Sequence, residues 1–180
     1  MLFHETELNG AYILEPQRIA DQRGFFARAW CATEFSERGL NTQLAQCNIS
    51  YNANKGTLRG MHYQAAPHAE TKLIRCTIGA IYDVIIDLRP ESPTYTKHIG
   101  VTLSAESRLL LYIPEGFAHG FLTLTDESEV FYQMSEFYMP AAARGVRWND
   151  PAFGIVWPAA VEIIATRDAS YPDFDEASQQ

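Results

Sequence analysis

Two histidines lie in the segments of this chain that combine polar residues with glycine. His62 lies in Gly56–Gln64, GTLRGMHYQ, three residues after Arg59, and His119 lies in Ile113–Phe121, IPEGFAHGF. Histidine has an unperturbed pKa of about 6.5, so its imidazole can accept a proton near neutral pH or bind a metal ion. The two segments therefore predict one pocket, in which His62 is either a base or a metal ligand.

A metal site is one alternative. The PEGFAH motif at Pro114–His119 is similar to the second motif of metal-binding cupins, in which the histidine is a ligand. The first cupin motif supplies two histidines as HxH, whereas this chain has Gln64 two residues after His62. Imidazole and carboxylate groups bind transition metals well, and an amide is a weak replacement. A site of His62, Glu70 and His119 stays open, and it would imply a metal-dependent cupin such as a dioxygenase.

A site without metal needs an acid and a fixed positive charge beside the base. Tyr132 alternates with apolar residues, a pattern more typical of a core residue than of a catalyst. Lys72 begins a strand and could direct a cation inward. Arg23 and Arg59 each precede a glycine, which lets the backbone approach a ligand while the guanidinium binds a phosphate. These side chains suit proton transfer on a ligand that carries phosphate.

Short strands separated by turns must position these residues. Leu73–Leu88, LIRCTIGAIYDVIIDL, is the clearest strand region, and Gly79 divides it into two runs with apolar residues on both faces. Further strands are expected at Ala11–Leu14, Ile99–Leu103, Leu109–Ile113, Phe121–Leu124 and Glu129–Glu136. Many short strands with frequent turns predict an all-β fold, specifically a cupin-type jelly roll.

Only a few short peripheral helices are expected beside these strands. Thr33–Arg38 is predicted to form one of them, with Thr33 as its N-cap and Gly39 at its end. Asp21–Gly24 is predicted to form a turn that precedes two phenylalanines. The chain is expected to form one domain over residues 1–180, with an acidic, solvated tail from about residue 172.

Composition excludes several classes of protein. Apolar residues make up 47% of the 180 residues, which is typical of a globular chain, and no run approaches the roughly 18 apolar residues of a membrane span. The net charge of −8 argues against binding to nucleic acid. The N-terminus lacks the order of a signal peptide, and the three cysteines carry no CxxC spacing. We therefore expect a cytoplasmic protein with reduced thiols.

Taken together, the motifs closely resemble the dTDP-4-dehydrorhamnose 3,5-epimerase family. The similarity runs in family order across nearly the whole chain, and LRGMHYQ with IPEGFAHGF is a specific combination. The matching segments are DQRGFF at Asp21–Phe26, NKGTLRGMHYQ at Asn54–Gln64, KLIRC at Lys72–Cys76, SPTY at Ser92–Tyr95, LYIPEGFAHGF at Leu111–Phe121 and RWNDPAFGIVWP at Arg147–Pro158. The resemblance implies a cupin jelly roll and a homodimer without metal or other cofactor. It also implies a nucleotide-linked 4-keto-6-deoxyhexose as the substrate, inverted at C3 and C5.

The resemblance also implies roles for individual residues. His62 would be the base, Tyr132 the acid, and Asp168 the aspartate that orients and charges the histidine. Lys72 would stabilise the enolate oxygen, a role for a fixed positive charge in a site shielded from water. Tyr138 would stack on the nucleobase. The remaining sugar-nucleotide contacts would come from Arg23, Arg28, Gln46, Asn48, Arg59, His119 and Arg167. Nothing in the pattern around Asp168 marks it without the resemblance.

Two departures from the family pattern bear on the nucleotide. The family usually has a glutamate where this chain has Arg28, and another family glutamate falls on Ala143. Both positions lie near the nucleotide in the family, so a cytidine- or guanosine-linked sugar is the alternative to a thymidine-linked one. An epimerase that acts on only one carbon and a sugar-binding module without catalysis are the remaining alternatives.

Overall fold

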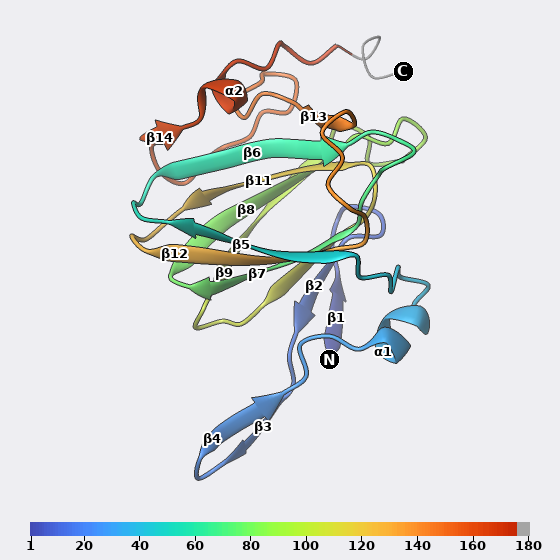
Figure 1. Ribbon diagram of the computed structural model, residues 1–180, viewed down its shortest axis with the longest axis vertical. Helices are drawn as coiled ribbons and strands as arrows, with labels where there is room; N and C mark the ends of the chain where they lie inside the picture. The colour runs from blue at the N-terminus through green and yellow to red at the C-terminus, as the bar shows by residue number, and fades with distance from the viewer. Residues whose placement is uncertain (176–180) are drawn as a thin grey trace.

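The computed structural model describes residues 1–175 and is built almost entirely from two antiparallel sheets that pack face to face (Figure 1). In order across the first sheet lie β1 (Leu2–Glu5), β2 (Tyr12–Glu15), β10 (Leu110–Ile113), β7 (Lys72–Ile78), β12 (Ser128–Met134) and β5 (Gln46–Asn52). The second sheet holds β13 (Ala143–Gly145), β6 (Thr57–Gln64), β11 (Phe117–Thr123), β8 (Ala80–Asp87) and β9 (His98–Ser104). The short strand β14 (Ile163–Ile164) pairs with β6 in parallel. The all-β prediction is confirmed.

The strand region at Leu73–Leu88 divides at Gly79, as predicted. Gly79 joins β7 to β8 with a φ of +73°, and a Cβ there would lie 2.4 Å from Thr125 Oγ1. Both constraints favour glycine because it has no side chain and tolerates positive φ. The bend at Gly79 therefore sends β7 and β8 into opposite sheets.

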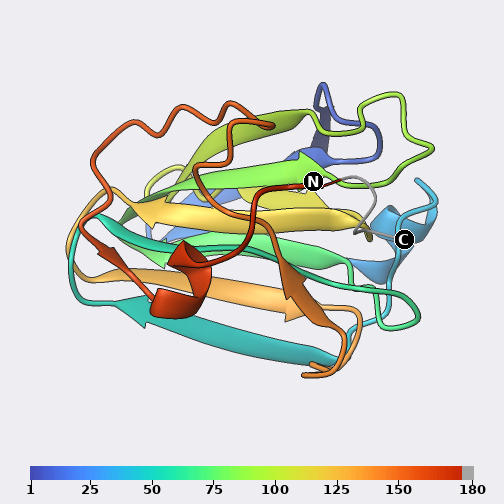
Figure 2. The ribbon, with the colours of Figure 1, turned by 90° about the horizontal axis from the view of Figure 1, so that it is seen from above.

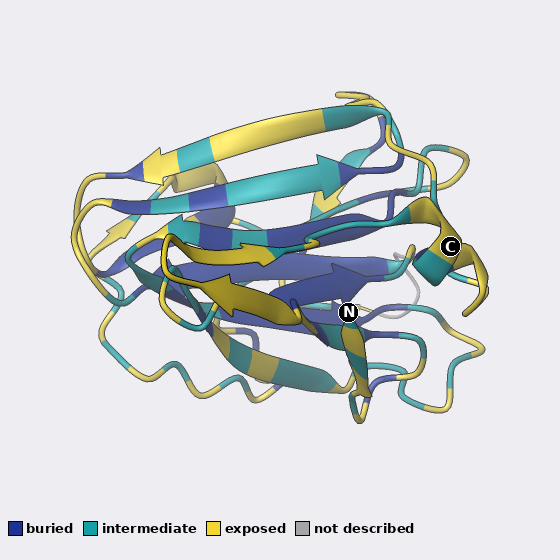
Figure 3. Ribbon diagram, turned by 90° about the horizontal axis from the view of Figure 1, so that it is seen from below, coloured by how far each residue is buried: buried dark blue, intermediate teal, exposed yellow. Residues whose placement is uncertain are grey.

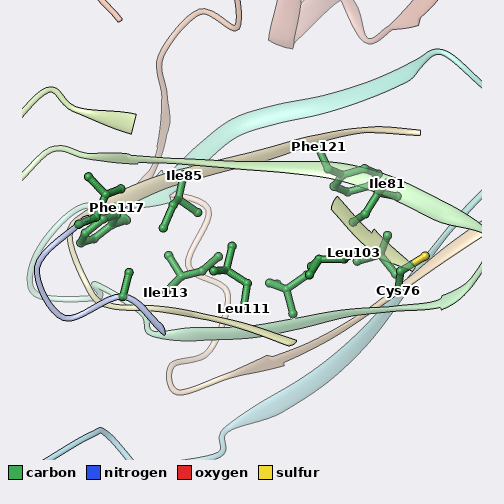
Figure 4. Packing of buried hydrophobic residues seen from close by; sticks show 12 residues of the cluster. Cys76, Ile81, Ile85, Leu103, Leu111, Ile113, Phe117 and Phe121 are labelled. Atoms are coloured by element: carbon green, nitrogen blue, oxygen red, sulfur yellow. The ribbon is translucent and has the colours of Figure 1, made fainter. Parts of the chain in front are cut away.

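The core between the two sheets comes from the inward faces of these strands. Ile81 and Ile85 of β8 are fully buried there, against apolar side chains from β7, β10 and β11 (Figure 4). The labelled members of this cluster are Cys76, Ile81, Ile85, Leu103, Leu111, Ile113, Phe117 and Phe121. Burying each such aliphatic side chain contributes roughly 1.5–3 kcal/mol, so this face fixes the register of the strands.

The C-terminal segment covers the outer face of the second sheet (Figure 2). Phe153 and Phe174 pack ring against ring 4.9 Å apart, in a cluster that includes Met61 of β6. The Phe174 N–H donates a hydrogen bond to Asp150 at 2.6 Å. Pro172, Asp173 and Asp175 are exposed, which agrees with the predicted solvated tail, but Phe174 is half-buried because an aromatic side chain gains by burial. Residues 176–180 of that tail lie outside the described residues.

The described part of the chain holds two short helices, α1 (Ala32–Ser36) and α2 (Thr166–Ala169). The predicted helix at Thr33–Arg38 exists, but Cys31 rather than Thr33 is its N-cap. Thr33 lies inside the first turn, where its carbonyl accepts the Glu37 N–H. Neither helix is long and apolar enough to cross a membrane.

A separate hairpin projects from the body of the molecule. It consists of β3 (Arg18–Asp21) and β4 (Gly24–Ala27), and it confirms the predicted turn. Figure 1 shows the hairpin at the opposite end of the molecule from α2, and Figure 3 shows it exposed along both strands. Its apolar side chains Ile19 and Phe26 are both exposed.

Candidate active site

A cavity of about 380 Å³ opens between the two sheets. One wall consists of β6 and β11, and the facing wall of β5, β7 and β12. The lining residues that matter below are Asn48, Ser50, Arg59, His62, Glu70, Lys72, His119, Tyr132, Tyr138, Ala143, Arg144, Arg167 and Asp168. The structure thus brings nine of the predicted site residues to one cavity.

His62 forms a short contact with Asp168 at the wall made by β6. Its Nε2 lies 2.7 Å from Asp168 Oδ1, and the side chain of His62 is 43% exposed while that of Asp168 is 6% exposed. A carboxylate partner favours the tautomer with hydrogen on Nε2, which leaves Nδ1 to accept a proton. The pair has the arrangement of a base with its orienting carboxylate.

Asp168 reaches this place through the C-terminal segment. β14 pairs with the start of β6, and α2 follows at once and lies beside the same strand (Figure 2). Its aspartate contacts Gly60 and His62 in the middle of β6. The second oxygen of Asp168 accepts the N–H of Gly60 at 3.2 Å. Burial raises the pKa of Asp168, but the hydrogen bonds from His62 and Gly60 and the charge of Arg167 outweigh it. The pKa of this carboxyl therefore lies below its usual value, and Asp168 is an anion at neutral pH.

Tyr132 lies on the facing wall, on β12. Its ring meets the ring of His119 edge to face, with centroids 6.0 Å apart. Burial and the nearby charge of Asp83 raise the pKa of the Tyr132 phenol, although Arg59 opposes them. The phenol therefore keeps its proton at neutral pH and can donate it.

Lys72 is buried in the same wall with a carboxylate partner. Its ammonium lies 2.6 Å from Glu70 Oε1, with side chains 8% and 2% exposed, and it also donates to the backbone carbonyl of His62 at 3.4 Å. A buried ammonium is costly unless it is paired, and this one is paired. Lys72 thus supplies a fixed cation close to His62.

A second histidine–aspartate pair lies next to the first. His119 is directly opposite His62 in the pairing of β11 with β6, and its Nε2 lies 2.9 Å from Asp83 Oδ2. Both side chains are almost fully buried. Burial raises the pKa of Asp83, against the opposing effects of His119 and Lys72.

Arg59 lines the cavity although strict alternation would place it opposite His62. The pairing of β6 with β11 shifts register between His119 and Phe121, and this irregularity turns both Arg59 and His62 toward the cavity. Arg59 Nε donates to Asn52 at 2.7 Å, which holds the guanidinium in place.

The mouth of the cavity is aromatic and basic. Tyr138, Arg144 and Arg167 are exposed there beside Ala143. The whole lining holds four cationic side chains, Arg59, Lys72, Arg144 and Arg167, against the carboxylates of Glu70 and Asp168. An anion is therefore favoured in this cavity even though the protein carries a net charge of −8.

Three predicted site residues lie outside the cavity. Gln46 is close to its rim, where its amide oxygen accepts the N–H of Tyr138 at 2.9 Å. Arg23 lies at the tip of the β3–β4 hairpin, with its side chain 84% exposed and paired with Asp21. Arg28 follows the same hairpin and pairs with Glu34 at 3.0 Å. Within one chain, Arg23 and Arg28 do not join the other residues.

Three charged residues in or behind the cavity wall were not predicted as parts of a proton-transfer site. Arg144, which lines the cavity, and Asp83, which pairs with His119 behind the wall, had no expected role, and Glu70 was considered only as a metal ligand. A charged residue on the inward face of an apolar strand, as Asp83 is in β8, was the available signal. The exposed position of Arg144 has no comparable signal in the sequence.

The side chains expected to bind a metal ion are not grouped as ligands in residues 1–175. Among residues 1–175, no three His, Cys, Asp or Glu side chains are grouped so that they could hold a metal ion. His62, Glu70 and His119 pair instead with Asp168, Lys72 and Asp83, respectively.

The two packed antiparallel sheets with a polar cavity between them have the architecture of a cupin-type jelly roll, and comparisons with known proteins define the family. Residues 5–176 match the model of the dTDP-4-dehydrorhamnose 3,5-epimerase family. The chain belongs to this family, and both the resemblance and the jelly-roll prediction are confirmed.

Individual relatives align over most of their length. A dTDP-4-dehydrorhamnose 3,5-epimerase from Shigella flexneri is 41% identical over 96% of this chain and 96% of its own. The crystal structure of the Bacillus anthracis enzyme of that name, with TDP and PPi bound, is 41% identical, covers 96% of this chain and 99% of its own, and has a TM-score of 0.92. A dTDP-4-dehydrorhamnose 3-epimerase from Streptomyces niveus is 36% identical over 89% of this chain and 78% of its own.

Proposed function

We propose that this protein is an isomerase that inverts C3 and C5 of a nucleotide-linked 4-keto-6-deoxyhexose, without a cofactor. The observation that carries the proposal is the placement of His62, paired with anionic Asp168, on one wall of the cavity and of protonated Tyr132 on the other. Inversion at a carbon requires proton removal from one face and proton return to the opposite face.

The proposed reaction proceeds through an enolate. His62 removes a proton from the carbon beside the ketone, the C–H electron pair forms a C=C bond, and the ketone oxygen becomes negative. Tyr132 then gives its proton to the opposite face of that carbon, and the C=O bond forms again. Solvent returns the phenol and the imidazole to their starting states.

Lys72 and His119 serve the oxygen atoms of the sugar in this proposal. A fixed ammonium near the ketone lowers the energy of the enolate because its charge is in place before the reaction. His119, held by Asp83, suits a hydrogen bond to a sugar hydroxyl or to the ketone.

The rim of the cavity would hold the nucleotide. Arg59 and Arg167 suit the diphosphate, Asn48 suits a polar contact, and Tyr138 offers an exposed ring for stacking on the base. The activities for which the relatives are named favour a thymidine-linked sugar. Arg28 and Ala143, which stand where the family usually has glutamates, keep a cytidine- or guanosine-linked sugar as the alternative.

We infer that a homodimer completes the site. The hairpin places Arg23 and Arg28 away from the cavity of their own chain, and it exposes apolar Ile19 and Phe26. Exposed apolar side chains on a projecting hairpin favour a contact with another copy. In such a dimer, Arg23 and Arg28 would reach the nucleotide bound by the partner.

A cytoplasmic location and the absence of a nucleic-acid partner stay predictions. The first rests on the three unpaired cysteines, Cys31, Cys47 and Cys76, and the second on the acidic balance of the chain.

Deuterium exchange tests the reaction. In heavy water the protein should introduce deuterium at C3 and C5 of dTDP-4-keto-6-deoxyglucose, as followed by proton NMR. Exchange at C3 alone would instead identify a 3-epimerase, which the Streptomyces niveus relative makes the second candidate. No exchange with the thymidine, cytidine or guanosine form of this sugar would refute the proposal. Stoichiometric metal in active protein, with loss of activity on chelation, would favour the metal-dependent alternative.

Subunit mixing tests the dimer. His62→Ala and Arg23→Ala should each be nearly inactive alone, whereas an equal mixture, unfolded and refolded together, should regain about a quarter of wild-type activity. The reason is that half of the dimers become mixed and each mixed dimer contains one intact site. No recovery, together with a monomer in light scattering, would refute the shared site.

A further inference from the structure

We infer that Glu70 is a positioning residue for the reaction: its carboxylate holds the Lys72 ammonium at the place where the enolate oxygen forms. The inference deepens the proposed function and rests on it. It starts from a feature that the reaction itself does not explain, namely a buried carboxylate in the wall of the cavity.

The contact between Glu70 and Lys72 is short and sealed from solvent. Oε1 of Glu70 lies 2.6 Å from the ammonium, and the side chains are 2% and 8% exposed. The other oxygen, Oε2, is buried without a hydrogen-bond partner among the described residues. A buried acceptor without a partner costs stability, so a carboxylate here needs a reason beyond packing.

The segment that carries Glu70 is fastened at both ends. Gln64 donates a hydrogen bond to the carbonyl of His68 at 2.9 Å. Thr71 and Ser135 exchange two hydrogen bonds, of 2.8 and 3.0 Å. Glu70 lies between these anchors, so its carboxylate cannot shift far from Lys72.

The same ammonium is tied to the proposed base. Lys72 also donates to the carbonyl of His62, so Glu70 and β6 together fix the distance between the cation and His62. With these two acceptors engaged, one ammonium hydrogen is left to meet an oxygen in the cavity. A charge that needs no reorientation during the reaction stabilises a developing anion more than a mobile one does.

A double-mutant cycle tests this inference. Glu70→Gln should lower kcat roughly tenfold to a hundredfold, with KM and the affinity for dTDP changed less than about twofold. Lys72→Met should lower kcat further, and Glu70→Gln combined with Lys72→Met should be no slower than Lys72→Met alone. Thermal unfolding gives a readout without substrate: the double variant should be more stable than Lys72→Met, which leaves Glu70 buried and unpaired.

A matched control separates positioning from stability. Asp87 is a buried carboxylate paired with Arg89 at 2.7 Å outside the cavity, so Asp87→Asn should lower the melting temperature and leave kcat unchanged. The inference would be overturned if the double variant lost kcat by the product of the two single losses, because the two residues would then act independently. A Glu70→Gln protein that loses stability but keeps the wild-type kcat would overturn it as well. A wild-type protein without exchange activity would refute the proposed function itself. The unfolding measurements need no substrate, so they would still test the pairing of Glu70 with Lys72 in that case.

Discussion

The two histidine–aspartate pairs of this cavity are built from the same residue types and have opposite surroundings. His62 and His119 are direct neighbours across β6 and β11. Asp168 comes from a C-terminal helix, receives two hydrogen bonds and has a lowered pKa. Asp83 comes from the inner face of β8, is fully buried and has a raised pKa.

The difference shows how access decides the role of a histidine. His62 opens onto the cavity while its carboxylate is shielded, so its imidazole can exchange a proton with a ligand. His119 is almost sealed, so it suits a fixed hydrogen bond. The first pair fits a base and the second a binding contact, and the predictions below test this division.

The largest difference is expected from replacing the two histidines. His62→Asn should lower kcat by about 10³-fold because the base is lost. His119→Asn should lower kcat/KM only about tenfold, mostly through KM, because a binding contact is lost. Steady-state kinetics on both variants measure this, and equal losses in kcat would contradict the division.

Replacing the two aspartates should affect different properties, catalysis for Asp168 and stability for Asp83. Asp168→Asn should lower kcat roughly 10²-fold, since an amide does not stabilise the charged imidazole, while dTDP affinity is kept. Asp83→Asn should lower the free energy of unfolding by about 3 kcal/mol, because it breaks a buried pair. Urea unfolding and isothermal titration calorimetry distinguish these outcomes. An Asp83→Asn protein of wild-type stability would show that this pair is not structural.

The smallest expected effect is on stability against pH. Because the folded-state pKa of Asp168 is lowered, its contribution is present above the unfolded pKa of 3.8 and is lost as the pH falls through the folded pKa. The stability gap between wild type and Asp168→Asn, about 1 kcal/mol at neutral pH, should therefore shrink below about pH 4. The difference in free energy of unfolding between wild type and Asp83→Asn should instead grow as the pH falls. The reason is that the pKa of Asp83 is raised in the folded state, so protonation of this carboxyl favours folding. Urea unfolding at several pH values measures both, and two gaps that move in the same direction would contradict the comparison.

The walls of the cavity could be predicted from sequence to a considerable extent. Alternating apolar residues and Gly79 locate β7 and β8, and the family motifs point to His62, Lys72 and Tyr132. The contact of Asp168 with His62 could not be predicted from local patterns, because it depends on a C-terminal segment that returns to β6. Only the resemblance to a known family indicated it.

Contacts that depend on strand pairing could not be predicted. Arg59 and His62 share the cavity because of a register shift that involves β11, some distance along the chain. The pairing of Asp83 with His119 joins two strands whose adjacency no local pattern specifies. The burial of Phe174 likewise depends on Phe153 lying beneath it.

The most direct test of two-sided proton transfer is the product formed by Tyr132→Phe in heavy water. We expect NMR to show deuterium entering the substrate with its configuration retained, because His62 still removes a proton and Tyr132 no longer protonates the opposite face. His62→Ala should show neither exchange nor inversion. Inversion by Tyr132→Phe at the wild-type rate would contradict the account, since the acid would then come from another group.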